Sequence, residues 1–126
     1  MADFKHRKHF DSFASAWRGI IISLQTQPNF QIMILATAVL IFAGAFFQLS
    51  QIEWVVLTVM VAVVFIAEMV NTSIEAMVDL ITKEWREEAK IAKDVGGGMV
   101  LLSVFMSIIV GTIVFLPKLL RLFWPS

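Results

Sequence analysis

Cysteine is absent from the sequence, which excludes disulfide bonds and thiol-based catalysis. Charge is absent from two long stretches, because no Asp, Glu, Lys or Arg occurs in residues 19–52 or in residues 95–117. Each stretch exceeds the roughly 20 apolar residues that an α-helix needs to cross the hydrocarbon core of a bilayer. With 59% hydrophobic residues and a mean hydropathy of +0.83, the chain also lacks the polar surface of a soluble domain. The composition therefore predicts an integral membrane protein.

The hydrophobic pattern predicts an all-α membrane protein with one surface helix and three transmembrane helices. No short apolar block near the start ends in a small-residue cleavage site, so we expect no cleavable signal peptide. Residues 1–126 are expected to form a single domain. Its predicted parts are an amphipathic surface helix at 4–25, spanning helices at 30–49, 53–81 and 95–116, and a charged connector at 82–94 that is helical for part of its length.

Prolines and aromatic residues separate these parts. Pro28 disfavours helix at the residue before it and so ends the surface helix, and Pro117 is expected to end the third spanning helix. The surface helix carries apolar residues at helical spacing on one side and basic residues on the other, as in helices that lie in the membrane interface. A polar turn, residues 48–53, precedes Trp54, which we expect to lie at the interface.

The basic residues predict the orientation of the chain in the membrane. Three spans place the two termini on opposite sides. A cytoplasmic N-terminus puts eight basic residues in the cytoplasm: Lys5, Arg7, Lys8, Arg18, Lys83, Arg86, Lys90 and Lys93. Only Lys118 and Arg121 then lie outside. The positive-inside rule favours this orientation.

A polar stripe runs along the second spanning helix. Glu68, Asn71, Glu75 and Asp79 are separated by three, four and four residues, which places them within an arc of roughly 80° on one helix face. A charged side chain at the centre of a spanning helix costs on the order of 2.5–3.5 kcal/mol on insertion scales. The stripe therefore indicates a protein-lined functional site. Immersion in headgroup water is the alternative, and it accounts for Asp79 better than for Glu68 or Asn71.

A second cluster is Lys90-Ile91-Ala92-Lys93-Asp94-Val95-Gly96-Gly97-Gly98. It places Lys93 and Asp94 at the mouth of the third spanning helix, on the same side of the membrane as the stripe. Phosphoryl transfer needs a cation to neutralise phosphate oxygens, carboxylates to hold Mg²⁺, and a base for the acceptor hydroxyl. The cation can be Lys93, a carboxylate for Mg²⁺ can be Glu75, and the base can be Glu68. A lysine alone can equally be a topology determinant, so its position opposite the carboxylates carries the interpretation.

The glycine run at residues 96–98 is not a P-loop, because no Gly-Lys-Ser/Thr follows it. Small residues in the third spanning helix favour close helix packing instead: Gly98, Ser103, Ser107 and Gly111.

These residues resemble the prokaryotic diacylglycerol kinase and undecaprenol kinase family. The central match is Glu68-x-x-Asn71-Thr72-x-Ile74-Glu75-x-x-x-Asp79, followed by Ala92-Lys93-Asp94. Supporting matches are Trp17-x-Gly19, Asn29-Phe30, Ile52-Glu53-Trp54, Asp79-Leu80-Ile81-Thr82 and Phe115-Leu116-Pro117-Lys118-Leu119. The resemblance covers nearly the whole chain, and two of these segments look closest to the Gram-positive undecaprenol kinase branch.

The resemblance implies a homotrimer with active sites between subunits, and ATP and Mg²⁺ as co-substrate and cofactor. It implies Glu68 as general base, Asn71 as a positioning residue and Glu75 as a Mg²⁺ ligand. The residues implied in ATP binding are Glu75, Glu84, Trp85, Arg86, Lys93 and Asp94. Those expected to meet the lipid are Trp17, Asn29, Phe30 and Glu68.

One position departs from the family pattern. Where many members have a second metal-binding glutamate, this chain has Gln27, whose amide oxygen can coordinate a metal but adds no charge.

The expected function is transfer of the γ-phosphate of MgATP to a membrane lipid alcohol, with undecaprenol as the first candidate and diacylglycerol as the second. No nucleic-acid partner is expected. A different kind of protein stays open: a non-enzymatic membrane subunit or a small ion-coupled transporter. A transporter, however, needs ionisable groups across the membrane, whereas these lie at one interface.

Overall fold

The computed structural model describes residues 9–124, and these fold into four helices joined by short turns. The helices are α1 (His9–Thr26), α2 (Pro28–Phe46), α3 (Gln51–Ile81) and α4 (Glu87–Phe123). Three of them, α2, α3 and α4, are long and apolar enough to cross a membrane. The predicted architecture of a surface helix and three spanning helices is confirmed. Residues 4–8 of the expected surface helix, with Lys5, Arg7 and Lys8, lie outside the described part of the chain.

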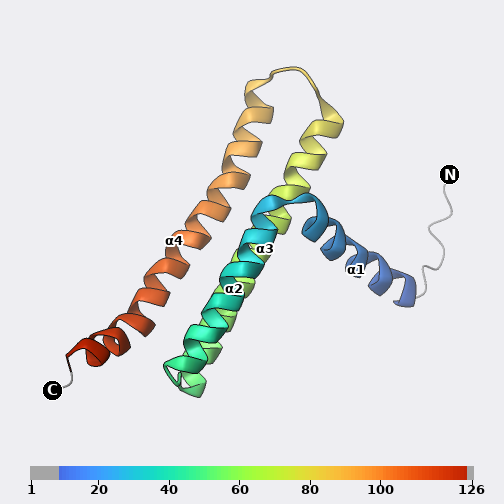
Figure 1. The fold of residues 1–126 in the computed structure, drawn as a ribbon. Coiled ribbons are helices and arrows are strands. Elements are labelled where there is room, and N and C mark those ends of the chain that lie inside the picture. Colours follow the sequence, from blue (N-terminus) through green and yellow to red (C-terminus); the bar gives the residue numbers. More distant parts are fainter. Residues whose placement is uncertain (1–8, 125–126) are drawn as a thin grey trace.

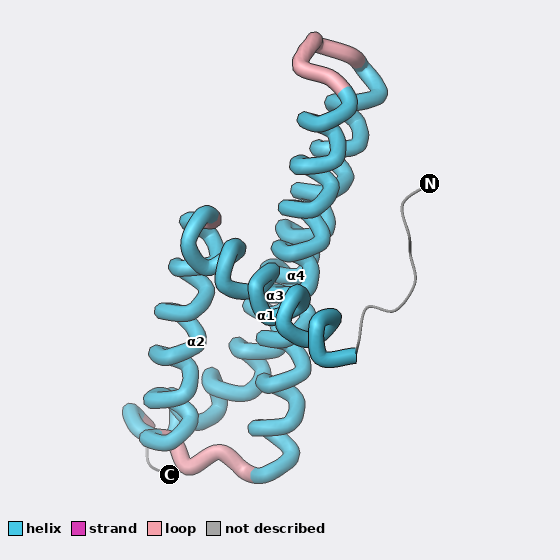
Figure 2. The backbone as a smooth tube through the Cα atoms, turned by 90° about the vertical axis from the view of Figure 1, so that its right-hand side faces the viewer, coloured by secondary structure: helices cyan, strands magenta, loops and turns pink. Residues whose placement is uncertain are grey.

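The helices α3 and α4 form a long antiparallel hairpin (Figure 1). The helix α2 runs back along the N-terminal half of α3 (Figure 2), while α1 turns away from the bundle at the α1–α2 junction (Figure 1). The C-terminal half of α3 and the N-terminal half of α4 therefore extend together beyond α2. The polar stripe lies on this extension of the hairpin, at the end opposite the turn between α2 and α3.

The bounds of α4 differ from those predicted for the third spanning helix. Helix starts at Glu87, so the nonhelical link after α3 shrinks to residues 82–86. Glu87 and Glu88 occupy the first turn, where negative side chains are favoured by the partial positive charge of a helix N-terminus. The prediction of a span that begins near residue 95 thus missed two helical turns, although part of the connector was expected to be helical.

The prediction that the third span ends at Pro117 was wrong, because α4 continues through this residue to Phe123. Proline removes one backbone donor from the helix, and spanning helices tolerate this loss when neighbouring groups compensate. Beyond Pro117 the Nζ of Lys118 lies 3.1 Å from the Oε1 of Glu53 on α3. This ion pair ties the end of α4 to the start of α3.

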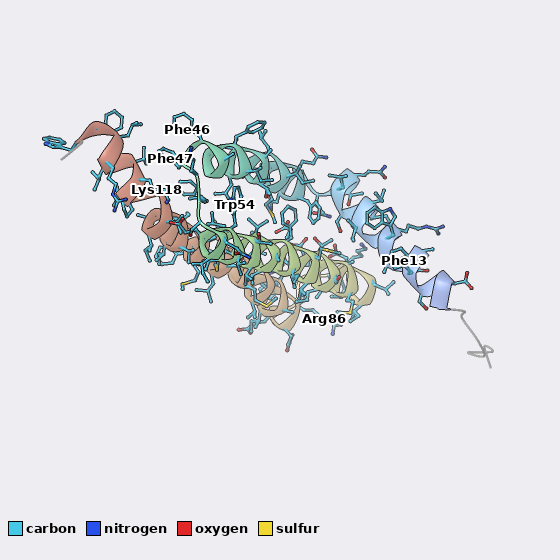
Figure 3. All side chains as sticks on the ribbon, turned by 90° about the horizontal axis from the view of Figure 1, so that it is seen from below. Phe13, Phe46, Phe47, Trp54, Arg86 and Lys118 are labelled. Atoms are coloured by element: carbon cyan, nitrogen blue, oxygen red, sulfur yellow. The ribbon has the colours of Figure 1, made fainter. Side chains whose placement is uncertain are left out.

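A capping box and a small apolar cluster stabilise the end of the bundle at the turn between α2 and α3. Ser50 N donates to Glu53 Oε2 at 2.7 Å, and Glu53 N donates to the Ser50 hydroxyl at 3.3 Å, which fixes the start of α3. The cluster centres on Leu49, Leu57 and Val114. Trp54 packs against this cluster; Figure 3 shows it on the same end of the bundle as Phe47 and Lys118.

Much of the apolar surface of the spans is uncovered within one chain. Leu35, Phe42 and Leu101 are among many large apolar side chains that are more than half exposed. An exposed apolar area of this extent marks contact with lipid or with other protein chains. The fold thus matches a multi-pass membrane protein.

Candidate active site

The polar stripe on α3 passes from buried to half-exposed along the helix. Glu68 is 2% exposed and Asn71 is 8% exposed, whereas Glu75 and Asp79 are partly accessible. The buried Asn71 lies against Gly96 of α4, so the α3–α4 hairpin provides a protein wall beside this part of the stripe. Exposure to headgroup water therefore does not explain Glu68 and Asn71.

Lys93 lies beside the outer end of the stripe. Its Nζ is 2.7 Å from Asp79 Oδ1, and both side chains are partly exposed. The two residues meet because residues 82–86 turn α4 back along α3. The sequence placed Lys93 opposite the carboxylates, and in the structure its partner is Asp79. Along the axis of α3, Asp79 is about 16 Å from Glu68.

Asn71 and Glu75 are the two middle residues of the stripe. Asn71 Nδ2 donates to Glu75 Oε1 at 3.2 Å. Two further oxygens, Glu68 Oε2 and Asn71 Oδ1, are buried and have no hydrogen-bond partner. Leaving a buried polar atom unpaired typically costs about 1–3 kcal/mol, and more for a charged group. Such atoms suit a site whose ligand or partner supplies the missing donor or cation.

The sequence did not identify Gly96 as part of this site. Gly96 is buried against Asn71, whereas the Cα atoms of Gly97 and Gly98 face open space. The expected packing role of Gly98 is therefore wrong for contacts within one chain, and Gly96 has that role. The run of three glycines signals close packing in general, but which glycine faces α3 depends on the rotation of α4.

The α1–α2 junction lies close to the level of Glu68. Phe30 is buried, and its ring meets that of Phe65 edge-on, with ring centroids 4.8 Å apart. Because α2 and α3 are antiparallel, the residue three positions before Phe30 and the residue three positions after Phe65 lie at a similar height. These residues are Gln27 and Glu68.

Glu75 lies about 10 Å further along α3, so the structure does not bring Gln27 and Glu75 together as the proposed metal pair. The Gln27 side chain donates instead to the hydroxyl of Thr26 at 3.4 Å. Trp17 and Asn29, the other residues expected to meet lipid, are exposed.

The residues predicted to contact ATP near the connector are solvent-exposed. Glu84, Trp85 and Arg86 lie on the turn between α3 and α4 (Figure 1). Asp94 forms an ion pair with Lys90 on the same helix, so it does not join the stripe. This part of the candidate nucleotide site is open on one side within a single chain.

The side chains present fit a partial magnesium site, which substrate phosphates would complete, better than a site built from protein ligands alone. Within residues 9–124, no group of three or more His, Asp or Glu side chains is close enough to hold a metal ion. Magnesium, however, is usually bound by one or two carboxylates together with substrate phosphates. The partly accessible Glu75, which accepts a hydrogen bond from Asn71, suits such a partial ligand set.

An apolar cavity of about 360 Å³ lies between α2, α3 and α4. Val64 and Phe65 form one end of its wall, one helical turn from Glu68. The buried carboxylate thus stands next to an apolar space, and the lysine and the exposed turn lie on its other side. This arrangement can bring a polar group on an apolar molecule to Glu68.

Comparison with known proteins identifies relatives of this chain. The family model for prokaryotic diacylglycerol kinase matches residues 14–115. An undecaprenol kinase of Bacillus subtilis is 39% identical over 112 residues, which cover 89% of this chain and 91% of the relative. A diacylglycerol kinase of Synechocystis is also 39% identical over 112 residues, 88% of this chain but 64% of the relative. The diacylglycerol kinase of Escherichia coli K12 is 29% identical over 94 residues, 75% of this chain and 77% of the relative.

By their names, these relatives are kinases of lipid alcohols. The matched residues include the stripe, the connector and Lys93. The alternative of a non-enzymatic subunit or transporter is therefore set aside. A kinase uses ATP as co-substrate, and three apolar helices suit an enzyme of the membrane. The chain belongs to the prokaryotic diacylglycerol kinase family and is a membrane lipid kinase.

Proposed function

We propose that this enzyme transfers the γ-phosphate of MgATP to the hydroxyl of a membrane lipid alcohol, with undecaprenol as the physiological acceptor. The observation that carries the proposal is the buried, unpaired carboxylate oxygen of Glu68 beside an apolar cavity. The relative from B. subtilis, which this chain matches over 91% of its length, supports undecaprenol. Diacylglycerol is the second candidate, because a relative of equal identity is named for it.

Glu68 is proposed as the general base. A lipid in the cavity keeps its tail among apolar side chains and presents its hydroxyl to the unpaired oxygen. Glu68 accepts the hydroxyl proton while the hydroxyl oxygen bonds to the γ-phosphorus, and ADP leaves with the electrons of the broken P–O bond. A base of this kind contributes typically ~10²–10⁴ in rate.

Asn71 and Glu75 are proposed to hold the metal end of the nucleotide. Their hydrogen bond fixes the Glu75 carboxylate, while the Asn71 oxygen lies buried against Gly96. Mg²⁺ bound there supplies positive charge to the phosphates. Lys93, with Arg86 and Trp85 on the exposed turn, is proposed to contact the rest of the nucleotide, and Asp79 holds Lys93 in place until then.

We propose that the active sites are shared between the subunits of a homotrimer. Within one chain the amine of Lys93 is held at Asp79, about 16 Å along the helix from Glu68. Both cannot contact the same phosphate in that arrangement. The exposed apolar faces of α2 and α4 offer the surface that assembly needs.

The site is proposed to face the cytoplasm of a bacterium, at its plasma membrane, with the N-terminus on the same side. This orientation places Arg18, Lys83 and Lys90 on the cytoplasmic side of the membrane. The cytoplasm is also the side on which ATP is available. The positive-inside rule supports the same orientation.

The acceptor is tested by a lipid panel in mixed micelles. Purified enzyme is given ATP and Mg²⁺ with undecaprenol, diacylglycerol or no lipid, and phosphorylated lipid is measured. We expect the highest kcat/KM with undecaprenol and no phosphate transfer without lipid. A higher kcat/KM with diacylglycerol would reverse the order of the acceptors. ATP consumption that ignores all lipids would contradict the proposed function.

A further inference from the structure

Three consecutive glycines begin the membrane-spanning part of α4, and only one of them is packed. A Cβ atom built on Gly97 or Gly98 meets nothing within 4 Å, whereas a Cβ on Gly96 lies 2.5 Å from Asn71 Oδ1. The other neighbours of that Cβ are ordinary contacts, with Asn71 Cγ at 3.5 Å and Ile74 Cδ1 at 3.6 Å. The missing side chain at position 96 therefore leaves room for one group, the amide oxygen of Asn71.

That amide is fixed from two sides. Its nitrogen donates to Glu75 Oε1 at 3.2 Å, and its oxygen rests against the backbone of Gly96. The Asn71 side chain is short and 8% exposed, so it has little space to move elsewhere. If a methyl group occupied the space beside Gly96, the amide would have to rotate, and the rotation would displace its nitrogen from Glu75.

The same end of α4 also carries Lys93, one helical turn before Gly96. Lys93 meets Asp79 and Gly96 meets Asn71, so a single stretch of α4 contacts two members of the stripe.

We propose that Gly96 is a positioning residue of the kinase reaction. It holds the Asn71 amide in the orientation in which the amide oxygen faces Gly96 and the nitrogen donates to Glu75. This inference rests on the roles proposed above for Asn71 and Glu75. Gly97 and Gly98 have no such role within the chain.

The neighbouring glycines provide matched controls. Gly96→Ala, Gly97→Ala and Gly98→Ala each add one methyl group to the same helical turn and remove the same backbone freedom. We expect Gly96→Ala to lower kcat by about 10- to 100-fold, because small displacements in an active site have effects of that order. KM for ATP should stay within a few-fold, since the pair of Lys93 and Asp79 is retained. Gly97→Ala and Gly98→Ala should stay within about two-fold of wild type in both constants.

A spectroscopic readout separates positioning from general damage. The side-chain amide signals of Asn71, assigned by their loss in Asn71→Ala, should shift in ¹⁵N-labelled Gly96→Ala and stay in place in Gly98→Ala. Equal losses of activity in all three alanine variants, or an unmoved Asn71 signal in Gly96→Ala, would overturn the proposal.

The double variant Asn71→Ala/Gly96→Ala shows whether Gly96 acts through Asn71. Once Asn71 is shortened, the methyl group at position 96 has nothing to displace, so the double variant should be no slower than Asn71→Ala. Additive losses would overturn the proposal. If Gly96→Ala fails to fold, recovery of folding in the double variant supports the contact, and failure of both overturns it.

The outcome for Asn71→Ala alone distinguishes this inference from the proposed function. A slow Asn71→Ala enzyme with a normal Gly96→Ala enzyme contradicts only the positioning role of Gly96. An Asn71→Ala enzyme with wild-type turnover contradicts the role of Asn71 in the proposed mechanism, and the positioning role falls with it.

Discussion

The carboxylate of Glu68 is almost completely shielded within one chain, and one of its oxygens has no hydrogen-bond donor. As a general base it should be indispensable for proton transfer and dispensable for nucleotide binding. We expect Glu68→Gln to lower kcat by ~10²–10⁴ and to leave the affinity for MgATP within a few-fold. Steady-state kinetics and nucleotide titration of the purified variant provide the two values.

Glu88→Gln is a matched control for this change, because Glu88 is an exposed glutamate in the first turn of α4 and has no proposed role. Normal turnover by a folded Glu68→Gln protein would remove Glu68 from the base role.

Glu75 is the carboxylate that Asn71 orients, and its charge should matter most for magnesium. A neutral amide binds a hard cation less well than a carboxylate does. We expect Glu75→Gln to raise the Mg²⁺ concentration for half-maximal rate steeply. Gln27→Glu should lower it if a neighbouring subunit of the proposed trimer brings position 27 to that metal. Rates measured across a Mg²⁺ series at fixed ATP provide the comparison.

The two changes probe different places, since Gln27 lies at the level of Glu68 within one chain. Superimposable Mg²⁺ titrations of Gln27→Glu and wild type would show that position 27 is not near the metal in the assembled enzyme.

At the scale of helices, the contact between α2 and α3 depends on a second close approach. A Cβ on Gly44 would lie 2.5 Å and 2.8 Å from two ring atoms of Trp54. An overpacked site of this kind typically costs about 1–3 kcal/mol. We therefore expect Gly44→Ala to lower the thermal unfolding midpoint in a fixed detergent. Gly19→Ala, whose added Cβ would meet nothing within 4 Å, should leave the midpoint unchanged or raise it. A Gly44→Ala protein as stable as Gly19→Ala would mean that Trp54 does not rest on Gly44.

The spanning helices could be predicted from the sequence because the bilayer imposes a simple demand. Two charge-free stretches have the length to cross it, and a shorter apolar run at residues 54–67 leads into the polar stripe; the structure has a helix at each. The ends were less predictable. Helix α4 continues past Pro117, and Lys118 there pairs with Glu53 on a different helix, a partner that no local pattern around the proline reveals.

In the candidate site, too, some features could be predicted from the sequence and others could not. The spacing of Glu68, Asn71 and Glu75 is a property of one helix, so periodicity alone placed them on one face. Contacts between helices were predictable only in outline: Lys93 was expected opposite the carboxylates, but its partner Asp79 and the approach of Gly96 depend on the rotation and height of α4.

At the scale of the whole molecule, the exposed apolar faces and the separation of Glu68 from Lys93 lead to a test of assembly. If sites are shared between chains, two inactive variants should complement each other. Mixing Glu68→Gln chains with Lys93→Ala chains before reconstitution should recover part of the activity, because some sites then combine two unaltered parts. Lipid phosphorylation by the mixture is compared with that of each variant alone.

Subunit exchange must be verified in the same sample, for example by pull-down through a tag on one variant. Exchange without recovered activity would show that each chain builds its own site, and the shared-site trimer would be abandoned.

The contacts between α3 and α4 also bear on how the chain enters the membrane. During synthesis α3 leaves the ribosome before α4, so Asn71 and Asp79 emerge before Gly96 and Lys93, their neighbours in the finished hairpin. Until α4 arrives, the stripe carries the insertion penalty of several polar groups with no protein wall beside them. The two helices are therefore expected to leave the insertion machinery as a pair, which makes the order of synthesis part of how this protein keeps its carboxylates away from lipid.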